Sequence, residues 1–188
     1  HLHGDELKVA FAFILSMPGA PFIYYGDEIG LRYVENLVSV EGGYSRTGSR
    51  SPMQWNHGVN LGFSNASPEK LYIPTDDKPN SPTVEDQMKD PNSLYYEVKK
   101  LIALRREHSA LLSDGDIEFV SDGADGSPLA YIRSSADEKI LVIINPADKE
   151  AVLEVPGIWN ESLYTVGGTV KAENGKRIIS PKSANVLR

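Results

Sequence analysis

Two neighbouring carboxylates, Asp27 and Glu28, are the first candidates for chemistry in this sequence. They follow a short apolar run that predicts a strand, and active sites of parallel-sheet enzymes form at the carboxyl ends of strands. Bond cleavage by a carboxylate pair requires that both groups flank the bond being broken. Adjacent residues of an extended chain point to opposite faces, so this pair cannot do so. We expect a structural role at the strand end; the alternative is a contact to a substrate pocket.

The histidines and the short motifs predict no metal, no cofactor and no catalytic group. His1 and His3 have a spacing that could suit a metal, but histidines at a chain end are usually exposed. His57 and His108 lie apart, and neither a cysteine nor a cluster of carboxylates completes a zinc site. The sequence also contains no Gly-x-Ser-x-Gly, no phosphate-binding P-loop and no Gly-x-Gly-x-x-Gly.

The composition is that of a soluble globular protein, and its charge suits an uncharged partner, as that of most acidic proteins does. The 188 residues are 40% hydrophobic and 24% charged, with a net charge of −7 and no cysteine. The negative charge argues against nucleic acid and anionic membranes as partners. The longest apolar run, Val9 to Met17, is too short to span a membrane, and no signal peptide is visible. The opening His1 without methionine hints at a fragment but is equally compatible with processing. We leave the compartment open, with a preference for the cytoplasm.

Residues 5–33 predict one helix followed by one strand. Leu7, Phe11 and Leu15 recur at helical spacing with apolar residues between them, so we expect a helix that is buried nearly all round. Pro18-Gly19-Ala20-Pro21 ends it. The run Phe22–Tyr25 predicts a buried strand. Helix, turn and strand in this order indicate one αβ unit of a parallel sheet.

Residues 34–90 predict a long ordered loop and are followed by a second helix. The loop is rich in Pro, Gly, Asn and Ser, and loops of this length tend to be functional. Asp90-Pro91 starts the helix as N-cap and first helical position, and the helix ends near Ser109. Its predicted apolar stripe is Leu94, Val98, Leu101, Ile102 and Leu104, and its predicted solvent face is Lys99, Lys100, Arg105 and Arg106.

From Asp114 onward the sequence predicts a small antiparallel β-sandwich. Turn signals such as Ala-Asp-Gly-Ser-Pro and Asn-Gly separate seven short strands. These are residues 117–120, 129–133, 140–145, 151–155, 163–166, 176–179 and 185–187. We place the domain boundary near residue 111, which gives domains 1–110 and 111–188.

Several stretches, in order along nearly the whole chain, resemble the C-terminal part of enzymes of the α-amylase family, glycoside hydrolase family 13. The segment Arg46 to Trp55, which contains Pro-Met-Gln-Trp, is the strongest element and is typical of the oligo-1,6-glucosidase, α-glucosidase and trehalose-synthase branch. The next strongest is Tyr-Gly-Asp-Glu-Ile-Gly at residues 25–30. Asp90 to Leu94, Leu101 to Arg105 and Pro181 to Leu187 resemble the last barrel helix and the closing strand of the family's C-terminal domain.

The resemblance implies a mixed α and β fold and a catalytic centre outside this chain. Residues 1–110 would be the last αβα portion of a (β/α)8 TIM barrel: the seventh helix, the eighth strand, the long loop 34–90 and the eighth helix. Residues 111–188 would be a Greek-key antiparallel β-sandwich. Family members use three carboxylates, and the third lies in an Asn-His-Asp motif shortly before the seventh helix. No such motif occurs here, and residue 1 would fall just after it. We expect the chain alone to be inactive.

The resemblance also implies that Arg46 and Arg50 contact substrate, with Trp55, Tyr44 and Phe63 as further candidates. The first arginine of this segment lies close to the sugar pocket in the glucosidase branch, and a guanidinium donates several hydrogen bonds to hydroxyl groups. The alternative is that both arginines pin the loop. Trp55 could stack on a sugar, but packing beneath the loop is the more frequent role. The chain departs from the family pattern at Thr47 and Asn56, which are commonly aspartates.

The resemblance implies an α-glucan oligosaccharide or disaccharide as the partner of the parent enzyme. Whether that enzyme is a hydrolase, a transglycosylase or an isomerase stays open. The alternatives are a non-catalytic glucosidase-like binding subunit and a free-standing carbohydrate-binding sandwich, although an apolar helix and strand in residues 5–105 make little sense without a barrel. Since the strand Phe22–Tyr25 has no parallel neighbour in this chain, we expect these first 110 residues to self-associate or rearrange.

Overall fold

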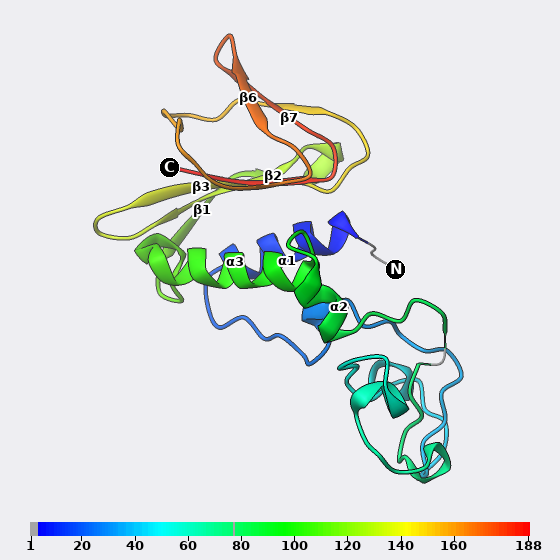
Figure 1. The fold of residues 1–188 in the computed structure, drawn as a ribbon. Coiled ribbons are helices and arrows are strands. Elements are labelled where there is room, and N and C mark those ends of the chain that lie inside the picture. The colour runs from blue at the N-terminus through cyan, green and yellow to red at the C-terminus, as the bar shows by residue number, and fades with distance from the viewer. Residues whose placement is uncertain (1–3, 77) are drawn as a thin grey trace. The chain divides into compact units, whose positions relative to one another are not determined.

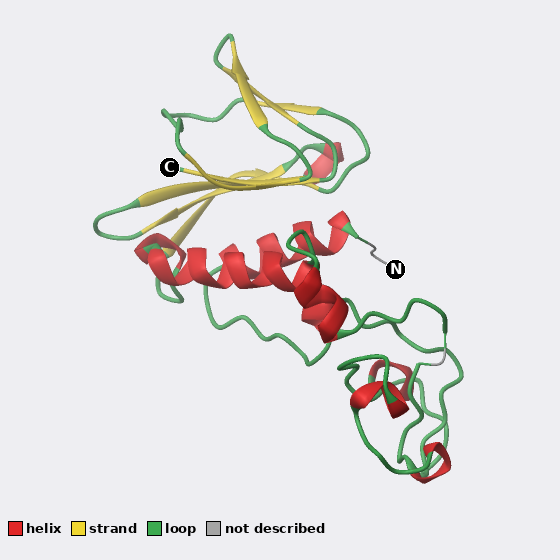
Figure 2. Ribbon diagram, viewed as in Figure 1, coloured by secondary structure: helices red, strands yellow, loops and turns green. Residues whose placement is uncertain are grey.

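A computed structural model of the chain describes residues 4–76 and 78–188 (Figures 1 and 2). Contacts between residues divide the chain into two compact units. One is Ile23–Glu97, and the other combines the residues up to Phe22 with Val98–Arg188. These units do not coincide with the sequence division at residue 111, which stays a prediction about domain organisation. Each unit is described by itself below.

The larger unit contains two antiparallel sheets, and their seven predicted strands are all present. The five-stranded sheet has the order β1 (Asp116–Asp122), β2 (Leu129–Ser134), β3 (Lys139–Asn145), β8 (Ser183–Leu187) and β5 (Ser162–Val166). The three-stranded sheet has the order β4 (Ala151–Leu153), β7 (Lys176–Ile179) and β6 (Val170–Glu173). The predicted mixed fold with antiparallel sheets is therefore confirmed.

Strand β3 lies at the centre of this unit. Its residues Ile140–Asn145 are all buried, because one face of the sheet contributes to the core and the helix α1 (Asp5–Ser16) packs against β3, β5 and β8 on the other (Figure 1). A strand covered on both faces has no polar face, which explains the uninterrupted run Ile-Leu-Val-Ile-Ile. The core cluster comprises Ala130, Leu141, Ile143, Val155, Trp159, Ile179 and Leu187.

Strand β6 was missed by the sequence analysis. It pairs with β7 across the Asn174-Gly175 turn, in which both residues have positive φ. The Asn-Gly signal was recognised as a turn, but Val-Lys-Ala-Glu has one large apolar residue and lies mostly exposed at the sheet edge. A strand without a buried face does not show the alternation of apolar and polar residues by which a strand is predicted.

The helices follow the predicted pattern with two differences. α1 buries Val9, Phe11 and Leu15 as expected, but Ile14 is exposed, so the helix is not buried all round. α3 (Leu94–Glu107) begins after the predicted Asp90, because the Asp90 carboxylate and carbonyl close a turn that precedes the helix. A short helix, α2 (Val84–Lys89), lies within the predicted loop. Among the described residues, none of the helices is long and apolar enough to cross a membrane.

The prediction of a buried strand at Phe22–Tyr25 is wrong for this chain. The segment is not assigned to any strand, and the Phe22 side chain is 93% exposed; Tyr24 and Tyr25 are also exposed. All ladders between strands in the described residues are antiparallel. An apolar segment that would need parallel neighbours on both sides finds none here, so it is left unpaired.

Arg105, which was predicted to face solvent, is buried. Its guanidinium donates hydrogen bonds to the carbonyls of Leu15 and Met17, both at 2.7 Å, and to that of Gly19 at 2.6 Å. These carbonyls belong to the last turn of α1 and the segment that follows it. Helix ends leave such carbonyls without backbone partners, and they carry partial negative charge. A positive group from α3 therefore stabilises the end of α1.

A second arginine reaches the same place from the sheet. Arg133 in β2 is fully buried and donates to the carbonyl of Ser16, to Leu112 at 2.7 Å, and to Gly115 and Asp116 at 3.1 Å each. Burial lowers the pKa of both guanidinium groups, yet arginine remains charged in proteins. Each buried cation is compensated by carbonyl dipoles.

Replacement of Arg105 by methionine should lower the free energy of unfolding by about 2–4 kcal/mol, because three carbonyls lose a charged donor. The matched control is Arg106→Met, the next residue of the same helix, whose side chain is exposed and whose loss should cost less than about 0.5 kcal/mol. Urea denaturation of both variants measures the difference. Equal losses would contradict the role assigned to Arg105.

Candidate functional site

The unit Ile23–Glu97 contains all five residues predicted to contact sugar. Much of its backbone runs in loops and in short 3-10 turns such as Thr47–Ser49 and Val59–Gly62. Backbone polar groups outside regular structure need other partners. Here side chains supply many of them, and these contacts position the candidate site.

An ion pair with a buried carboxylate joins Arg32, just before the long loop, to Asp76 within it. The Asp76 side chain is 2% exposed and accepts hydrogen bonds from Arg32 Nε at 3.0 Å and Arg32 Nη2 at 2.7 Å. Arg32 also donates to the Ser81 hydroxyl, and the Lys78 backbone N–H donates to Asp76. Burial opposes ionisation of Asp76, but the hydrogen bonds from Arg32, Lys78 and Ser81 outweigh it and hold the pKa of this carboxyl below its ordinary value.

Asp27 and Glu28 serve the backbone of a turn. They lie in a 3-10 turn, Asp27–Ile29, and not in the extended chain that the sequence analysis assumed. The Asp27 carboxylate accepts from the Tyr24 N–H at 3.1 Å, and that of Glu28 accepts from the Gly26 N–H at 2.8 Å. Gly26 has φ 90°, and a Cβ there would clash with the Leu31 side chain. These contacts support the structural role expected for the pair.

One pocket of this unit combines aromatic rings with a guanidinium. It has a volume of about 330 Å³ and is lined by Tyr25, Arg50, Pro52, Met53, Phe63, Tyr72 and Ile73; we call it the Arg50 pocket. The rings of Tyr25, Phe63 and Tyr72 are about half exposed. Burial, followed by the neighbouring Tyr24, raises the pKa of Tyr25, so its hydroxyl stays protonated and donates to the Ser51 carbonyl. Aromatic faces beside hydrogen-bond donors suit an uncharged polyhydroxylated ligand.

A second pocket has an indole ring as its largest side chain. It has a volume of about 460 Å³ and is lined by Trp55, Asn56, His57, Gly58, Val84, Glu85 and Met88; we call it the Trp55 pocket. Trp55 is 49% exposed, so the expectation that it packs beneath the loop is wrong. The two pockets share no lining residue.

The five predicted residues are thus not gathered in one place. Arg50 and Phe63 line the Arg50 pocket, and Trp55 lines the other. Arg46 lies over the ring of Tyr44, with its guanidinium carbon 4.8 Å from the ring centre, and neither residue lines a pocket described above. Whether any of the five contacts substrate stays a prediction.

Sequence reasoning did not identify Tyr25 and Tyr72 as pocket residues. Tyr25 was assigned to a buried strand, and Tyr72 lies in the stretch predicted as a long ordered loop. The signal that could have found them is the concentration of aromatic residues in a loop too polar to have its own core.

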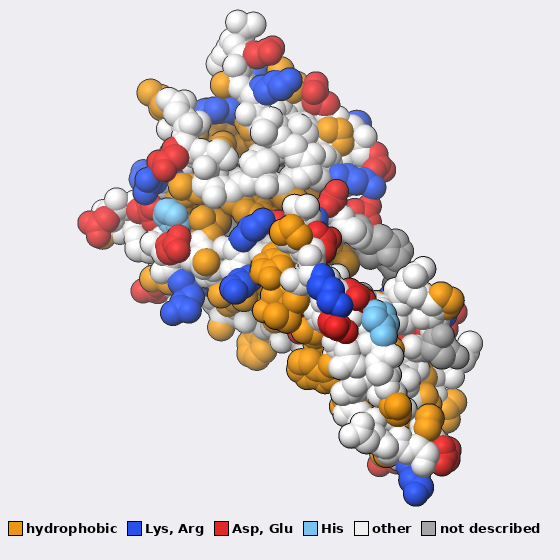
Figure 3. All heavy atoms as spheres, viewed as in Figure 1, with side chains coloured by type: hydrophobic (Ala, Val, Ile, Leu, Met, Phe, Trp, Pro, Cys, Tyr) orange, Lys and Arg blue, Asp and Glu red, His pale blue; other side chains and the backbone are white. Residues whose placement is uncertain are grey.

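The part of the chain that the structure describes contains no group of three or more His, Cys, Asp or Glu residues that could hold a metal ion. His1 and His3, which were considered as metal ligands, lie outside the described residues. Acidic and basic side chains are interspersed on the face shown in Figure 3.

Because of the Asp76–Arg32 pair, we expect the folded chain to lose stability in acid. Because the pKa of Asp76 is lower in the folded chain than in the unfolded one, its contribution is full above about pH 4 and is lost as the pH falls through the folded-state value. Asp76→Asn should therefore reduce the slope of unfolding free energy against pH below about pH 4. Tryptophan fluorescence during denaturation, measured in a Trp159→Phe background so that Trp55 is the sole reporter, follows this unit. Glu69→Gln, which removes an exposed carboxyl from the same unit, is the control and should keep the slope.

Comparison with known proteins identifies the family. The α-amylase catalytic-domain family matches residues 2–115. The trehalose synthase of Pimelobacter sp. (strain R48) is 35% identical over 75% of this chain and 25% of its own length. The glucan 1,6-alpha-glucosidase of Streptococcus pneumoniae is 34% identical over 96% of this chain and 38% of its own length. The chain therefore spans well under half of these relatives.

Solved structures agree at the level of the fold. The trehalulose synthase MutB from Pseudomonas mesoacidophila MX-45 superposes with a TM-score of 0.81 over 97% of this chain and 38% of that protein, at 22% sequence identity. An identity this low supports the fold alone. The family match, in contrast, covers more than half of the chain. This chain belongs to the α-amylase family of glycoside hydrolases.

Proposed function

We propose that this chain is the C-terminal part of a retaining glycoside hydrolase or transglycosylase that acts on α-glucosidic bonds of oligosaccharides or disaccharides. The observation that carries the proposal is the match of residues 2–115 to the α-amylase catalytic domain. Relatives named trehalose synthase and glucan 1,6-alpha-glucosidase support the choice of α-glucosides.

In this proposal, residues 1–110 complete a (β/α)8 barrel and residues 111–188 form its Greek-key sandwich. α1 would be the seventh barrel helix, Phe22–Tyr25 the eighth strand and α3 the eighth helix. The exposure of the contiguous run Phe22–Tyr25 supports this assignment, because contiguous exposed apolar surface marks a place where another part of a protein packs. The remaining barrel strands would supply the neighbours that Phe22–Tyr25 lacks.

The catalytic carboxylates would lie outside residues 1–188. A retaining mechanism needs two carboxyl groups about 5–5.5 Å apart, one as nucleophile and one as acid and base. Asp27 and Glu28 are engaged by backbone N–H groups of their own turn. The Asn-His-Asp sequence that the family uses for a third carboxylate does not occur in the chain.

The contribution of this chain to the chemistry would then be a wall of the sugar pocket. Arg50 and Phe63 share the Arg50 pocket, where a guanidinium can donate to hydroxyl groups and an aromatic ring can pack against the apolar face of a sugar. Arg46 would act with Tyr44, whose ring limits the directions in which its guanidinium can reach.

The first test compares the full-length parent protein with the 188-residue chain on 4-nitrophenyl α-glucoside. We expect turnover by the parent, with retained anomeric configuration seen by proton NMR, and none by the chain alone. Turnover by the chain would contradict the placement of the carboxylates. An inactive parent that still binds the glucoside would favour the alternative of a non-catalytic binding subunit.

A second test addresses Arg50. In the parent protein, Arg50→Ala should lower kcat/KM about 10- to 100-fold, because the sugar loses a charged hydrogen-bond donor worth about 1.5–3 kcal/mol. Arg46→Ala should lower it less, since Arg46 does not line the pocket. Lys70→Ala, an exposed cation of the same loop, is the control. A change for Arg50→Ala no larger than that for Lys70→Ala would contradict this role.

A further inference from the structure

The Trp55 ring is held in its exposed position by its own backbone. The Trp55 N–H donates to the Leu61 carbonyl at 2.8 Å, and the Trp55 carbonyl accepts from the Glu85 N–H at 3.0 Å. The preceding residue, Gln54, is fully buried and donates from its amide to the Pro82 carbonyl. A pinned backbone with a half-exposed indole is an arrangement that presents the ring to a ligand at little entropic cost.

The loop opposite this backbone is strained. Leu61 has φ of 54°, a left-handed conformation that a bulky side chain rarely adopts, whereas Asn60, with φ of 50°, is a residue type that tolerates it. The Asn60 amide donates to the carbonyls of Ser64 and Ala66 and thereby holds the turn. Strain of this kind clusters at binding sites, where the surrounding contacts fix a geometry that the chain would not choose alone.

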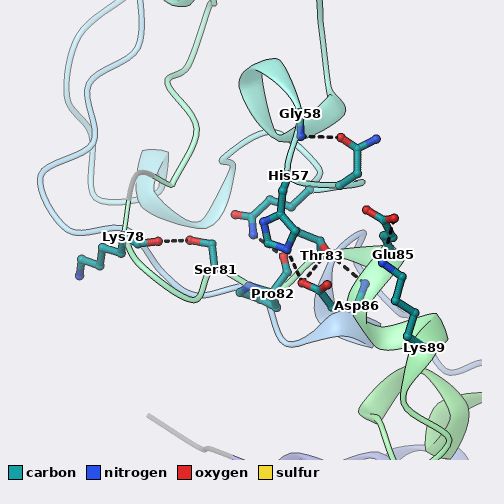
Figure 4. A network of polar contacts seen from close by, with 11 residues as sticks. His57, Gly58, Lys78, Ser81, Pro82, Thr83, Glu85, Asp86 and Lys89 are labelled. Atoms are coloured by element: carbon teal, nitrogen blue, oxygen red, sulfur yellow. Dashed lines mark hydrogen bonds and ion pairs between the residues drawn. The ribbon is translucent and has the colours of Figure 1, made fainter.

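Helix α2 supplies the other side of the pocket and is held by the residues that Figure 4 shows. The Thr83 hydroxyl accepts from the Asp86 N–H at 3.2 Å as an N-cap, and the His57 Nε2 lies 2.6 Å from Asp86 Oδ2. From α2, Val84 and Met88 add apolar surface to the pocket. His57 therefore ties the loop after Trp55 to the helix that faces it.

Within residues 4–76 and 78–188, three polar atoms around the pocket lack a hydrogen-bond partner and are available to a ligand. Hydrogen bonds from Thr83 and His57 hold the pKa of Asp86 below its ordinary value, so its carboxylate is ionised and His57 Nε2 carries a proton. This leaves His57 Nδ1. The Asn56 Oδ1 accepts from the Gly58 N–H at 2.8 Å, which leaves the Asn56 amide nitrogen as a donor. Glu85 pairs through one oxygen with Lys89 at 2.9 Å, which leaves the other as an acceptor.

Both carboxylates beside the pocket already have a hydrogen-bonded partner. Lys89 accompanies the Glu85 carboxylate, and the His57 N–H accompanies that of Asp86. A charged ligand would compete with these partners, whereas hydroxyl groups can add to them. An aromatic face with mixed donors and acceptors around it fits an uncharged ring that has one apolar face and several hydroxyls.

We propose that the Trp55 pocket binds one glucosyl unit of an α-glucan oligosaccharide, stacked on Trp55, at a site separate from the Arg50 pocket. The choice of an α-glucan rests on the proposed function. The separation rests on geometry, because the pockets have no lining residue in common.

The test is a titration of the full-length parent protein with maltotriose, followed by the indole N–H signals of Trp55 and Trp159, which single Trp→Phe variants assign. We expect a saturable shift of the Trp55 signal at millimolar maltotriose. The Trp159 signal should stay fixed, because that ring is 8% exposed and its N–H donates to the Pro156 carbonyl at 2.9 Å. No shift of Trp55 up to tens of millimolar, or an equal shift with sorbitol, would overturn the proposal.

Variants locate the site while keeping the reporter ring. Glu85→Ala should weaken the maltotriose affinity about tenfold through loss of a charged hydrogen-bond acceptor. Glu69→Ala, which removes an exposed carboxylate that lines neither of these pockets, should leave it within about twofold. Equal effects of the two would overturn the assignment to the Trp55 pocket. Failure of this proposal can be told apart from failure of the proposed function. If the parent protein is inactive but its Trp55 signal still shifts with maltotriose, only the proposed function is contradicted.

Discussion

The larger unit depends on one electrostatic constraint, which is how the carbonyl end of α1 is satisfied away from water. A buried guanidinium without a carboxylate is tolerated only if its donors find acceptors. Arg105 and Arg133 find them in the same stretch of backbone, Leu15 to Gly19, and Arg133 adds the carbonyls of Leu112, Gly115 and Asp116. The helix end, α3, the turn before β1 and the sheet are thereby held by one network. The apolar packing of α1 on β3 and β8 fixes which face is inward, and the arginines fix where the helix ends.

The unit Ile23–Glu97 satisfies its backbone polar groups by different means. It has little regular structure, so many of its backbone groups are bonded by Asp, Asn, Ser and Thr side chains, such as Asp27, Asn56 and Asn60. A backbone fixed in this way does not need its aromatic residues as a core. Tyr25, Trp55 and Phe63 can remain half exposed, which is the condition for their use in binding.

The periodicity of apolar residues predicted those helices and strands that are buried by partners within this chain. The alternating and continuous apolar runs located seven strands, and helical spacing located α1 and α3. The failures have physical causes. Phe22–Tyr25 has the composition of a buried strand, but pairing requires partners that the pattern cannot supply. Arg105 was assigned to the solvent face because helical periodicity places charged residues there. The carbonyls that bind its guanidinium lie 86–90 positions away in the sequence, where periodicity cannot detect them. The five candidate sugar contacts lie close in sequence, yet the turns between them divide them over two pockets and a surface pair.

The long-range hydrogen bonds of α1 also bear on the order in which the chain can fold. Ser16 is bonded to Arg133, 117 positions later, and Glu6 is bonded to Lys182, 176 positions later, at 2.7 Å. Contacts of such separation close very long loops, and folding rates fall as the mean separation of contacts rises. During synthesis, α1 leaves the ribosome long before either partner exists. Its apolar face therefore stays incompletely covered until β3, β5 and β8 have all been made, and this interval is when the growing chain most needs protection from aggregation.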